Sequence, residues 1–195
     1  MKPERAHLLK ELAEFGQHND SLHQQRALRM LNITPDTGEF LQVLVHATQA
    51  RQILEIGTSN GYSTIWLADA VEPLAGKVTT LEYAADKVEM AATNFAKAGV
   101  QDWIQQVQGD AGVYLQQAES GSVELLFLDS ERSQYLAWWP DLKRVLAAGA
   151  TLVVDNATSH AAEMQSFIEL VKADSDFVCC TVPVGNGEFL ATRRR

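Results

Sequence analysis

The sequence predicts an α/β domain built on a doubly wound, Rossmann-like sheet, mostly parallel, with helices on both faces. From residue 51 onward, short apolar runs typical of buried strands alternate with amphipathic helical stretches. Several of these runs end in an acidic or amide side chain, and glycines at positions 57 and 61 follow the first run. Because ligands bind outside the carboxyl ends of the strands in such sheets, these polar ends mark the expected binding edge.

The length and charge of the chain limit its organisation and its partners. A chain of 195 residues suits one well-buried core, so we expect a single domain over 1–195, with helical residues 1–50 and a ligand-binding core over 51–195. The net charge of −9 argues against nucleic acid or a membrane as a partner, because the only basic cluster is Arg193–Arg195. With no apolar leader or membrane span in the sequence, the expected location is cytoplasmic.

The N-terminal residues are expected to form helices. Apolar residues recur at helical spacing over 8–15 and over 40–45. The proline and glycine within 31–38 predict a turn between two helices, with Thr34 or Asp36 as the cap of the second helix. An apolar helix added to a sheet that its own helices already cover favours a homodimer.

The first predicted strand leads into a glycine-bracketed loop. Ile53–Ile56 is an apolar run that Gly57 ends, and Ser63 opens an amphipathic helix. Gly57 and Gly61 leave two places without a Cβ between the backbone and a ligand, although glycines that serve only packing are the alternative. Their spacing differs from the Gly-x-Gly-x-x-Gly of dinucleotide sites. Glu55 suits a ligand with a cationic tail.

The second predicted strand, 77–83, carries Glu82 near its end. An acidic side chain at this position, shortly after the glycine loop, is where open α/β sheets bind the two hydroxyls of a ribose. A nucleoside-containing ligand is therefore expected beside Glu82.

The remaining elements continue the alternation. In order, they are a helix through 88–95 that Gly99 ends, a strand over 104–110, a helix around 113–115, a strand over 123–129, a helix through 135–146 that Pro140 kinks or restarts, a strand over 150–156, a helix through 164–171, and two β-rich runs, 177–184 and 188–192, joined by a glycine turn. The last two runs predict a C-terminal antiparallel hairpin that completes the sheet.

Two of the predicted strands end in side chains that suit a metal ion. If the first, fourth and fifth strands are neighbours, Asp129 and the pair Asp155-Asn156 end on strands about 4.8 Å apart. Two carboxylates and an amide carbonyl favour a hard divalent ion such as Mg²⁺, Ca²⁺ or Mn²⁺. The alternative is that these side chains only cap the helices that follow.

Taken together, the motifs resemble the S-adenosylmethionine-dependent O-methyltransferases of the catechol and caffeoyl-CoA type, which have the class I methyltransferase fold. The segments that carry the resemblance are Glu55–Ser63, Thr80–Glu82, Gly109–Ala111, Leu128–Tyr135, Val154–Asn156 and Pro183–Gly187, so it covers nearly the whole chain. Residues 31–38 also resemble the segment that closes over the cofactor in this family, which replaces their interpretation as a plain connector.

The resemblance implies a set of binding residues. Asn32 and Ile33 would close over S-adenosylmethionine. Its methionine part would be surrounded by residues of the first strand and the loop after it, namely Glu55, Gly57, Thr58, Gly61, Tyr62 and Ser63. Glu82 would bind the ribose hydroxyls, Tyr83 would pack on the adenine, and Asp110 and Ala111 would border the adenine edge; Asp129 would lie at the cofactor and bind Mg²⁺ with Asp155 and Asn156.

One residue departs from the family pattern. Three residues after Asp129, the family has a lysine that serves as general base, and this chain has Arg132. Arginine keeps its proton at any working pH and cannot act as a base, although it is able to orient an anionic substrate. His160 is the other candidate base, against the alternative that it only starts a helix.

The expected function is therefore the transfer of a methyl group to a hydroxyl of a small, catechol-like molecule, assisted by a divalent metal. Three alternatives stay open. They are a metal-independent methyltransferase acting on nitrogen or an isolated hydroxyl, a non-catalytic protein that binds S-adenosylmethionine, and a nicotinamide oxidoreductase, which the glycine spacing disfavours.

Overall fold

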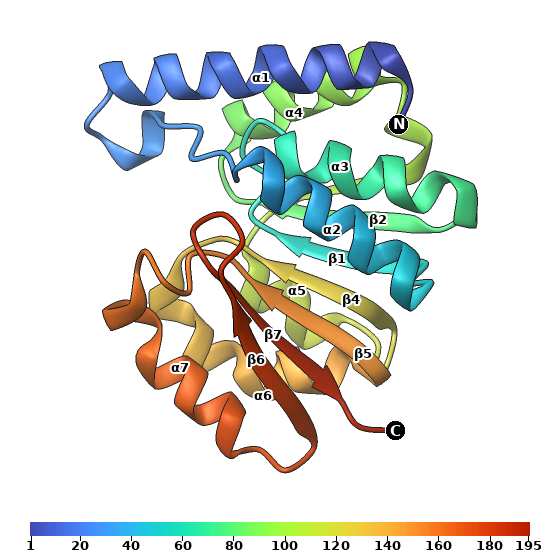
Figure 1. The fold of residues 1–195 in the computed structure, drawn as a ribbon, viewed down its shortest axis with the longest axis vertical. Coiled ribbons are helices and arrows are strands. Elements are labelled where there is room, and N and C mark those ends of the chain that lie inside the picture. Colours follow the sequence, from blue (N-terminus) through green and yellow to red (C-terminus); the bar gives the residue numbers. More distant parts are fainter.

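The computed structural model describes residues 1–195 and shows a seven-stranded sheet between layers of helices (Figure 1). The strands are β1 Gln52–Ile56, β2 Lys77–Glu82, β3 Ile104–Gln108, β4 Val123–Leu128, β5 Leu146–Val154, β6 Phe177–Val182 and β7 Glu188–Arg193. They lie in the order β3-β2-β1-β4-β5-β7-β6. The first five run parallel, and β7 pairs antiparallel with both β5 and β6. The predicted doubly wound sheet with a C-terminal hairpin is confirmed.

Helices cover both faces of the sheet. They are α1 Pro3–Leu22, α2 Pro35–Thr48, α3 Tyr62–Val71, α4 Ala85–Ala98, α5 Ala111–Gln117, α6 Tyr135–Val145 and α7 Ala161–Ala173. The first four contribute to one apolar core and the last three to the other. Successive residues of β1, such as Ile53 and Leu54, belong to opposite cores, which is why its sequence is a continuous apolar run. None of the helices combines the length and the apolar character that a membrane crossing requires.

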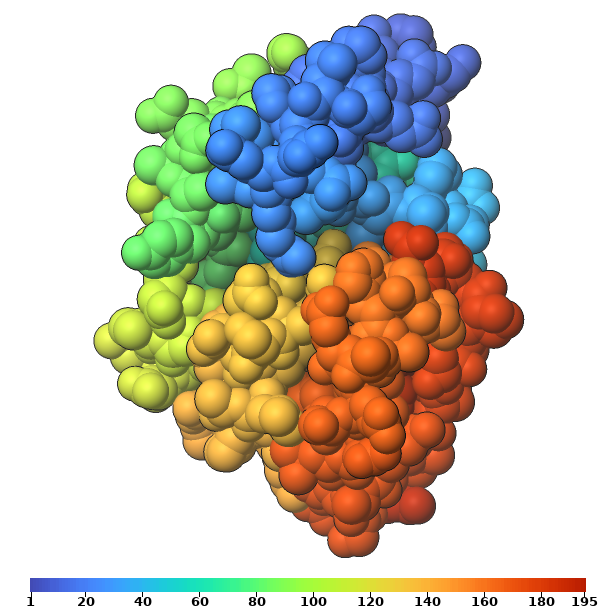
Figure 2. Space-filling model, turned by 90° about the vertical axis from the view of Figure 1, so that its left-hand side faces the viewer, coloured from blue at the N-terminus to red at the C-terminus, as the bar shows by residue number.

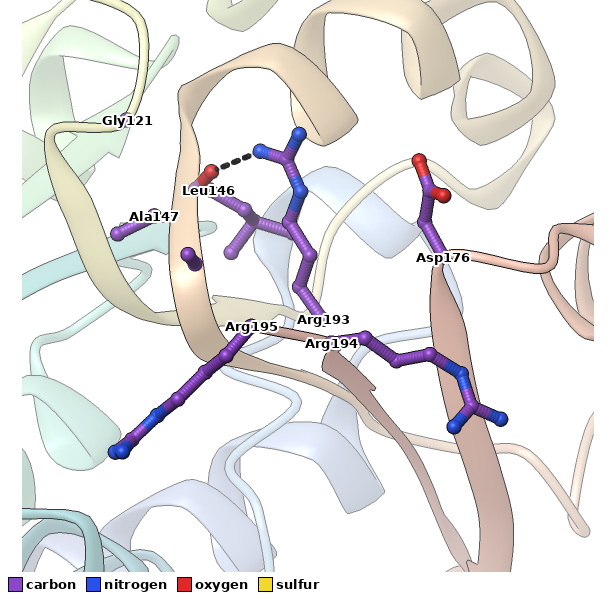
Figure 3. Close-up of a pocket in the computed structure, with 8 residues that line it drawn as sticks. Gly121, Leu146, Ala147, Asp176, Arg193, Arg194 and Arg195 are labelled. Atoms are coloured by element: carbon purple, nitrogen blue, oxygen red, sulfur yellow. Dashed lines mark hydrogen bonds between the residues drawn. The ribbon is translucent and has the colours of Figure 1, made fainter.

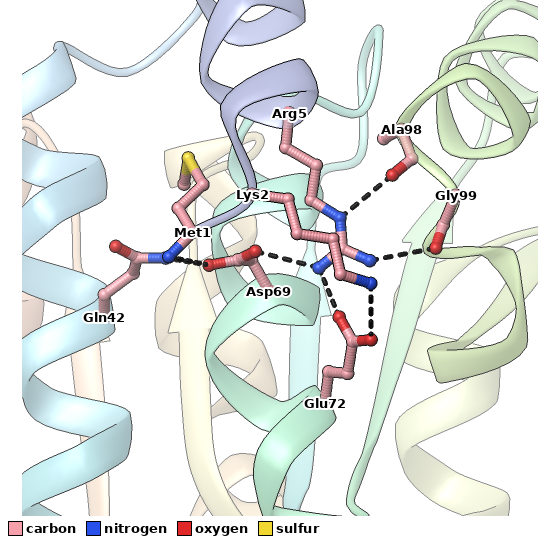
Figure 4. Close-up of polar contacts among 8 residues, drawn as sticks. All are labelled: Met1, Lys2, Arg5, Gln42, Asp69, Glu72, Ala98 and Gly99. Carbon is pink, nitrogen blue, oxygen red and sulfur yellow. Dashed lines mark hydrogen bonds and ion pairs between the residues drawn. The ribbon is translucent and has the colours of Figure 1, made fainter.

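A buried arginine fixes α1 against the helices beneath it (Figure 4). Arg5 is 2% exposed and donates hydrogen bonds to Asp69 Oδ1 at 2.8 Å and to the Glu72 carboxylate. Its remaining N–H groups reach the carbonyls of Ala98 at 2.9 Å and Gly99 at 3.0 Å. These partners offset the cost of burying the guanidinium, and they tie α1 to α3 and to the end of α4.

The predicted turn before α2 ends earlier than expected. The helix already begins at Pro35, with Thr34 as its N-cap, because Thr34 Oγ1 accepts a hydrogen bond from Thr37 N at 3.4 Å. Gly38 lies inside the helix, where a Cβ would stand 2.5 Å from the Trp66 ring. This glycine therefore permits close packing of α2 on α3 and does not form a turn.

Three other expectations differ in detail. Phe15, predicted on the apolar face of α1, is 46% exposed, and the buried apolar residues of that helix are Leu9 and Leu12. The helix α6 continues through Pro140, at the loss of one backbone hydrogen bond. The strand β5 begins at Leu146, earlier than the predicted residue 150, and its pairing with β4 contains a register shift.

Candidate active site

The polar strand ends predicted from the sequence lie at one edge of the sheet. The strands β2, β1, β4 and β5 are consecutive neighbours, so Glu82, Gly57, Asp129 and Asp155 lie at four adjacent carboxyl ends. Backbone hydrogen bonds join Asp129 to β1 at 3.1 Å and Asp155 to β4 at 3.2 Å. The fold therefore brings the glycine loop, residues 57–61, beside the predicted metal ligands.

The structure favours packing, the alternative interpretation, for the two loop glycines, and their place beside a ligand stays a prediction. A Cβ on Gly57, whose φ is +109°, would lie 1.9 Å from the carbonyl oxygen of Asp129. A Cβ on Gly61, whose φ is +84°, would lie 2.4 Å from the Phe95 ring. Both positions therefore need glycine for backbone conformation and packing. Gly57 allows the loop to lie against Asp129.

Glu55 lies beneath the glycine loop, and its side chain is 0% exposed. Its carboxylate accepts hydrogen bonds from Ser63 Oγ at 2.5 Å, from Thr80 Oγ1 at 2.6 Å and from the Thr64 hydroxyl. Burial raises the pKa of Glu55 to about 7, although these hydrogen bonds act in the opposite direction. The expectation that this carboxylate directly faces a cationic ligand tail is wrong for this structure, because Glu55 instead fastens the start of α3 to β1 and β2.

Glu82 holds the glycine loop against the end of β2. Its Oε2 accepts a hydrogen bond from Ser59 N at 2.9 Å, and its Oε1 accepts one from Ala84 N at 3.0 Å. The next residue, Tyr83, is 77% exposed. The binding of a ribose by Glu82 and of a base by Tyr83 stays a prediction.

Asp110 and Ala111 follow β3, next to the end of β2. The backbone at Gly109 donates to the Glu82 carbonyl at 2.9 Å, which places this turn beside the predicted ribose site. The Asp110 side chain caps α5 by accepting a hydrogen bond from Val113 N at 3.0 Å. Because the Asp110 side chain is used as a helix cap, a ligand beside this turn would contact the backbone of residues 110 and 111.

The segment 26–33 lies over the same edge. Ser59 Oγ donates to the carbonyl of Met30 at 2.7 Å, which attaches this segment to the glycine loop. Within it, Ile33 is buried and Asn32 is half-buried. Figure 2 shows the N-terminal residues, in blue, directly above the yellow segment after β4 and the orange segment after β5. The segment thus lies next to the glycine loop, and its closure over a cofactor stays a prediction.

The three predicted metal ligands meet in the structure. Asn156 Nδ2 donates to Asp155 Oδ2 at 2.7 Å and lies 3.4 Å from Asp129 Oδ1. Asp155 is 4% exposed, and its Oδ1 has no hydrogen-bond partner. Burial, followed by the charge of Asp155, holds the pKa of Asp129 well above its usual range.

The donor set at this place fits a hard divalent ion. The carboxylates of Asp129 and Asp155 repel one another, and Asp155 Oδ1 is buried without a hydrogen-bond partner. A cation would offset the repulsion and would bind the unpartnered oxygen. No three His, Cys, Asp or Glu side chains are grouped to hold an ion, so the third ligand would be the amide oxygen of Asn156. That oxygen now accepts from Ser159 Oγ at 3.1 Å, and a rotation of the amide would turn it toward the carboxylates.

The two candidate catalytic side chains lie at the rim of this cluster. Arg132 Nε donates to Glu163 Oε2 at 2.7 Å, which ties the turn after β4 to α7. His160 occupies the N-cap position of α7, and its Nδ1 lies 3.0 Å from Ser159 Oγ. His160 therefore lies where a residue that only starts a helix would lie.

Glu188, the first residue of β7, is not among the site residues predicted from the sequence. It is 0% exposed and accepts a hydrogen bond from Thr37 Oγ1 at 3.0 Å. An acid placed between a glycine turn and the apolar run Phe189–Ala191 is unusual, and this was the signal available in the sequence.

A separate hollow lies at the opposite edge of the sheet, where β5 starts and β7 ends (Figure 3). Its arginine side chains are partly committed to the fold, because Arg193 Nη1 donates to the carbonyls of Leu146 at 2.5 Å and Lys143 at 3.3 Å. This hollow is not part of the candidate site.

The fold and the site define an α/β domain of the class I methyltransferase type. The chain belongs to the O-methyltransferase family, whose sequence model matches residues 2–194. A catechol O-methyltransferase of Mycobacterium tuberculosis is 40% identical over 129 residues, which cover 66% of this chain and 58% of that protein. Caffeoyl-CoA O-methyltransferase 1 of Eucalyptus globulus is 27% identical over 186 residues, which cover 84% of this chain and 75% of that protein. The chain thus matches less than two thirds of the length of the mycobacterial relative.

Solved structures show the same fold. The cofactor-bound protein Rv0187 from MTB has 30% identity and a TM-score of 0.80, with coverage of 94% of this chain and 89% of that chain. The O-methyltransferase TomG of Streptomyces achromogenes, in complex with SAM, has 27% identity and a TM-score of 0.79, with coverage of 100% and 91%. The recognised family and the predicted fold class are therefore confirmed.

Proposed function

We propose that this protein transfers a methyl group from S-adenosylmethionine to a hydroxyl of a small, catechol-like acceptor, with a divalent ion held by Asp129, Asp155 and Asn156. The observation that carries the proposal is the convergence of these three side chains beside the glycine loop. Family membership and the SAM complex of the related TomG support the choice of cofactor.

When bound, the cofactor supplies the methyl group, and a divalent ion lowers the pKa of an acceptor hydroxyl. The chain positions both partners at one edge of its sheet. Glu82, which holds Ser59 N, would also accept hydrogen bonds from ribose hydroxyls, and the exposed Tyr83 would pack on the base. Positioning of this kind lowers the barrier of a transfer between two bound molecules.

No side chain acts as general base in this proposal. Arg132 keeps its proton and is held by Glu163, so its contribution is positive charge beside the acceptor. That charge favours acceptors with an anionic substituent. The acceptor proton would pass to solvent water from a hydroxyl that the ion makes more acidic, so the acceptor should offer two neighbouring oxygens.

A metal-independent methyltransferase is the competing function. One observation favours it: the nitrogen of the Asn156 amide faces the carboxylates. In this case the acceptor would be a nitrogen or an isolated hydroxyl, and the polar cluster would be structural.

The experiment is a comparison of acceptors by S-adenosylhomocysteine formation, each measured with Mg²⁺ and with excess chelator. Catechols that react only with Mg²⁺, while monophenols and amines stay unreactive, would support the proposal. Equal methylation of monophenols or amines in chelator would establish the competing function. Binding of S-adenosylmethionine without turnover of any acceptor would indicate a non-catalytic protein.

A further inference from the structure

Glu188 is a buried acid with an incomplete set of partners. Its side chain is 0% exposed, and Oε1 accepts a hydrogen bond from Thr37 Oγ1 at 3.0 Å. Its Oε2 has no N–H or hydroxyl partner, and its other side-chain hydrogen bond is with the carboxyl of Asp155. A buried carboxyl that faces a second carboxyl is costly, so this residue requires an explanation beyond packing.

The strand register places Glu188 opposite Asp155. Val154 of β5 pairs with Phe189 of β7 in an antiparallel ladder, so the next residue pair along the ladder is Asp155 with Glu188. Residues directly opposite in such a pair have side chains on the same face of the sheet. Asp155 Oδ1 also lacks a hydrogen-bond donor.

The two carboxyls are close enough to affect each other. A side-chain hydrogen bond joins the carboxyls of Asp155 and Glu188. Two carboxyls form such a bond only when one of them carries a proton. The contact fixes the direction in which the Asp155 carboxyl points.

Glu188 is also connected to the start of α2. Thr34 Oγ1 donates to Thr37 Oγ1 at 3.1 Å, and Thr37 in turn donates to Glu188. The glycine turn before β7 contacts the same helix start, because Gly185 N donates to Asp36 Oδ2 at 3.0 Å. A continuous hydrogen-bonded path therefore runs from the N-terminus of α2 to the end of β5.

We infer that Glu188, held by Thr37, is a positioning residue that fixes Asp155 for divalent-ion binding. This inference rests on the proposed function, since it concerns the ion site proposed there. Outer carboxylates that orient a metal ligand commonly change metal affinity by about 10- to 100-fold when they are replaced. Glu188 requires no contact with the acceptor for this role.

The test is the affinity for Mn²⁺, measured by electron paramagnetic resonance on the full chain without an acceptor. We expect Glu188→Gln, which keeps the size of the side chain, to weaken Mn²⁺ binding by about 10-fold or more. Thr37→Val, which removes the hydroxyl that donates to Glu188, should also weaken Mn²⁺ binding. Thr37→Ser keeps a hydroxyl and should bind Mn²⁺ as the wild type does. The control is Thr151→Val, which removes a hydroxyl of β5 that pairs with Thr192 Oγ1 at 3.1 Å, four residues before Asp155.

Two further measurements separate this inference from the proposed function. S-adenosylhomocysteine affinity should be unchanged in each variant, which shows that the fold is retained. If Asp155→Asn loses Mn²⁺ binding while Glu188→Gln binds it as wild type does, the inference is overturned and the ion site stands. If the wild type binds no Mn²⁺, both the ion site and the inference are overturned.

Discussion

Asn156 Nδ2 lies 3.4 Å from Asp129 Oδ1, so a single amide reaches between the ends of β5 and β4. The contact depends on the parallel pairing of these strands, in which Leu128 lies opposite Val154. Side chains 27 positions apart in the sequence thereby meet in one polar cluster beside the glycine loop. In the proposed function, this cluster would hold the divalent ion.

Replacement of Glu82 tests the cofactor site. We expect Glu82→Ala to weaken S-adenosylmethionine binding by ~2–3 kcal/mol, because a charge-assisted pair of hydrogen bonds to the ribose is lost. Isothermal titration calorimetry measures this loss. The matched control is Asp86→Ala, which removes an exposed carboxylate in the first turn of α4 and should leave the affinity unchanged. Wild-type affinity in Glu82→Ala would refute the ribose assignment.

Replacement of Gly57 tests the contact between the glycine loop and Asp129. A Cβ at Gly57 would overlap the carbonyl of Asp129, so Gly57→Ala should reduce the free energy of unfolding by roughly 2–4 kcal/mol. Gly121→Ala is the control, because Gly121 also has a positive φ, of +68°, but has no atom within 4 Å of an added Cβ. It should cost only about 1 kcal/mol. If urea denaturation shows that Gly57→Ala and Gly121→Ala lose the same free energy of unfolding, position 57 requires glycine only for its backbone conformation.

Stability should depend on pH through Glu55. Burial raises the pKa of this group from 4.5 to about 7, so the native state holds its proton in a pH range where the unfolded chain has released it. The contribution of Glu55 to stability is therefore present below about pH 4.5 and is lost as the pH rises through about 7, by on the order of 3 kcal/mol.

The variant Glu55→Gln has no such ionisation. The difference in unfolding free energy between wild type and Glu55→Gln should therefore fall between pH 4.5 and 7 and level off above that range. Urea denaturation at several pH values measures it. Parallel stability curves for the two proteins would show that Glu55 ionises with an ordinary pKa.

Arg132→Lys tests whether a side chain is needed as base. Lysine is able to release a proton whereas arginine is not. Because the proposal assigns proton loss to the ion site, we expect the pH profile of kcat/KM to keep its shape, with a change in rate of less than about threefold. A clear gain in rate, or a shifted pH optimum, would show that the missing lysine limits the reaction. It would also show that His160 does not replace it.

Much of the sheet follows from local sequence. The apolar run of β1 and the polar ends of β2, β4 and β5 predict a parallel sheet with one binding edge, since these features depend on residues close together in the chain. Gly99 ends α4 as predicted, with a φ of +62°. The convergence of Asp129 with Asp155 also follows once the usual strand order is assumed.

Other features depend on contacts that no local pattern contains. Positions 38, 57 and 61 need glycine because an added Cβ would clash with Trp66, Asp129 and Phe95 respectively, and these residues are distant in sequence. Glu188 meets Thr37 across 151 positions, and only the insertion of β7 between β5 and β6 brings it opposite Asp155. Contacts of this kind can be identified only from the three-dimensional structure.

The most direct test of the central claim is Mg²⁺-dependent methylation of a catechol by wild type and by Asp155→Asn, followed as S-adenosylhomocysteine formation. Melting temperature and S-adenosylmethionine affinity serve as controls for folding and for the cofactor site. We predict that excess chelator abolishes the wild-type activity, that added Mg²⁺ restores it, and that Asp155→Asn is inactive with both controls near wild type. A lost helix cap would instead cost about 1 kcal/mol of stability and leave turnover intact. Undiminished wild-type turnover in chelator would contradict the metal-dependent mechanism, whatever the variant does.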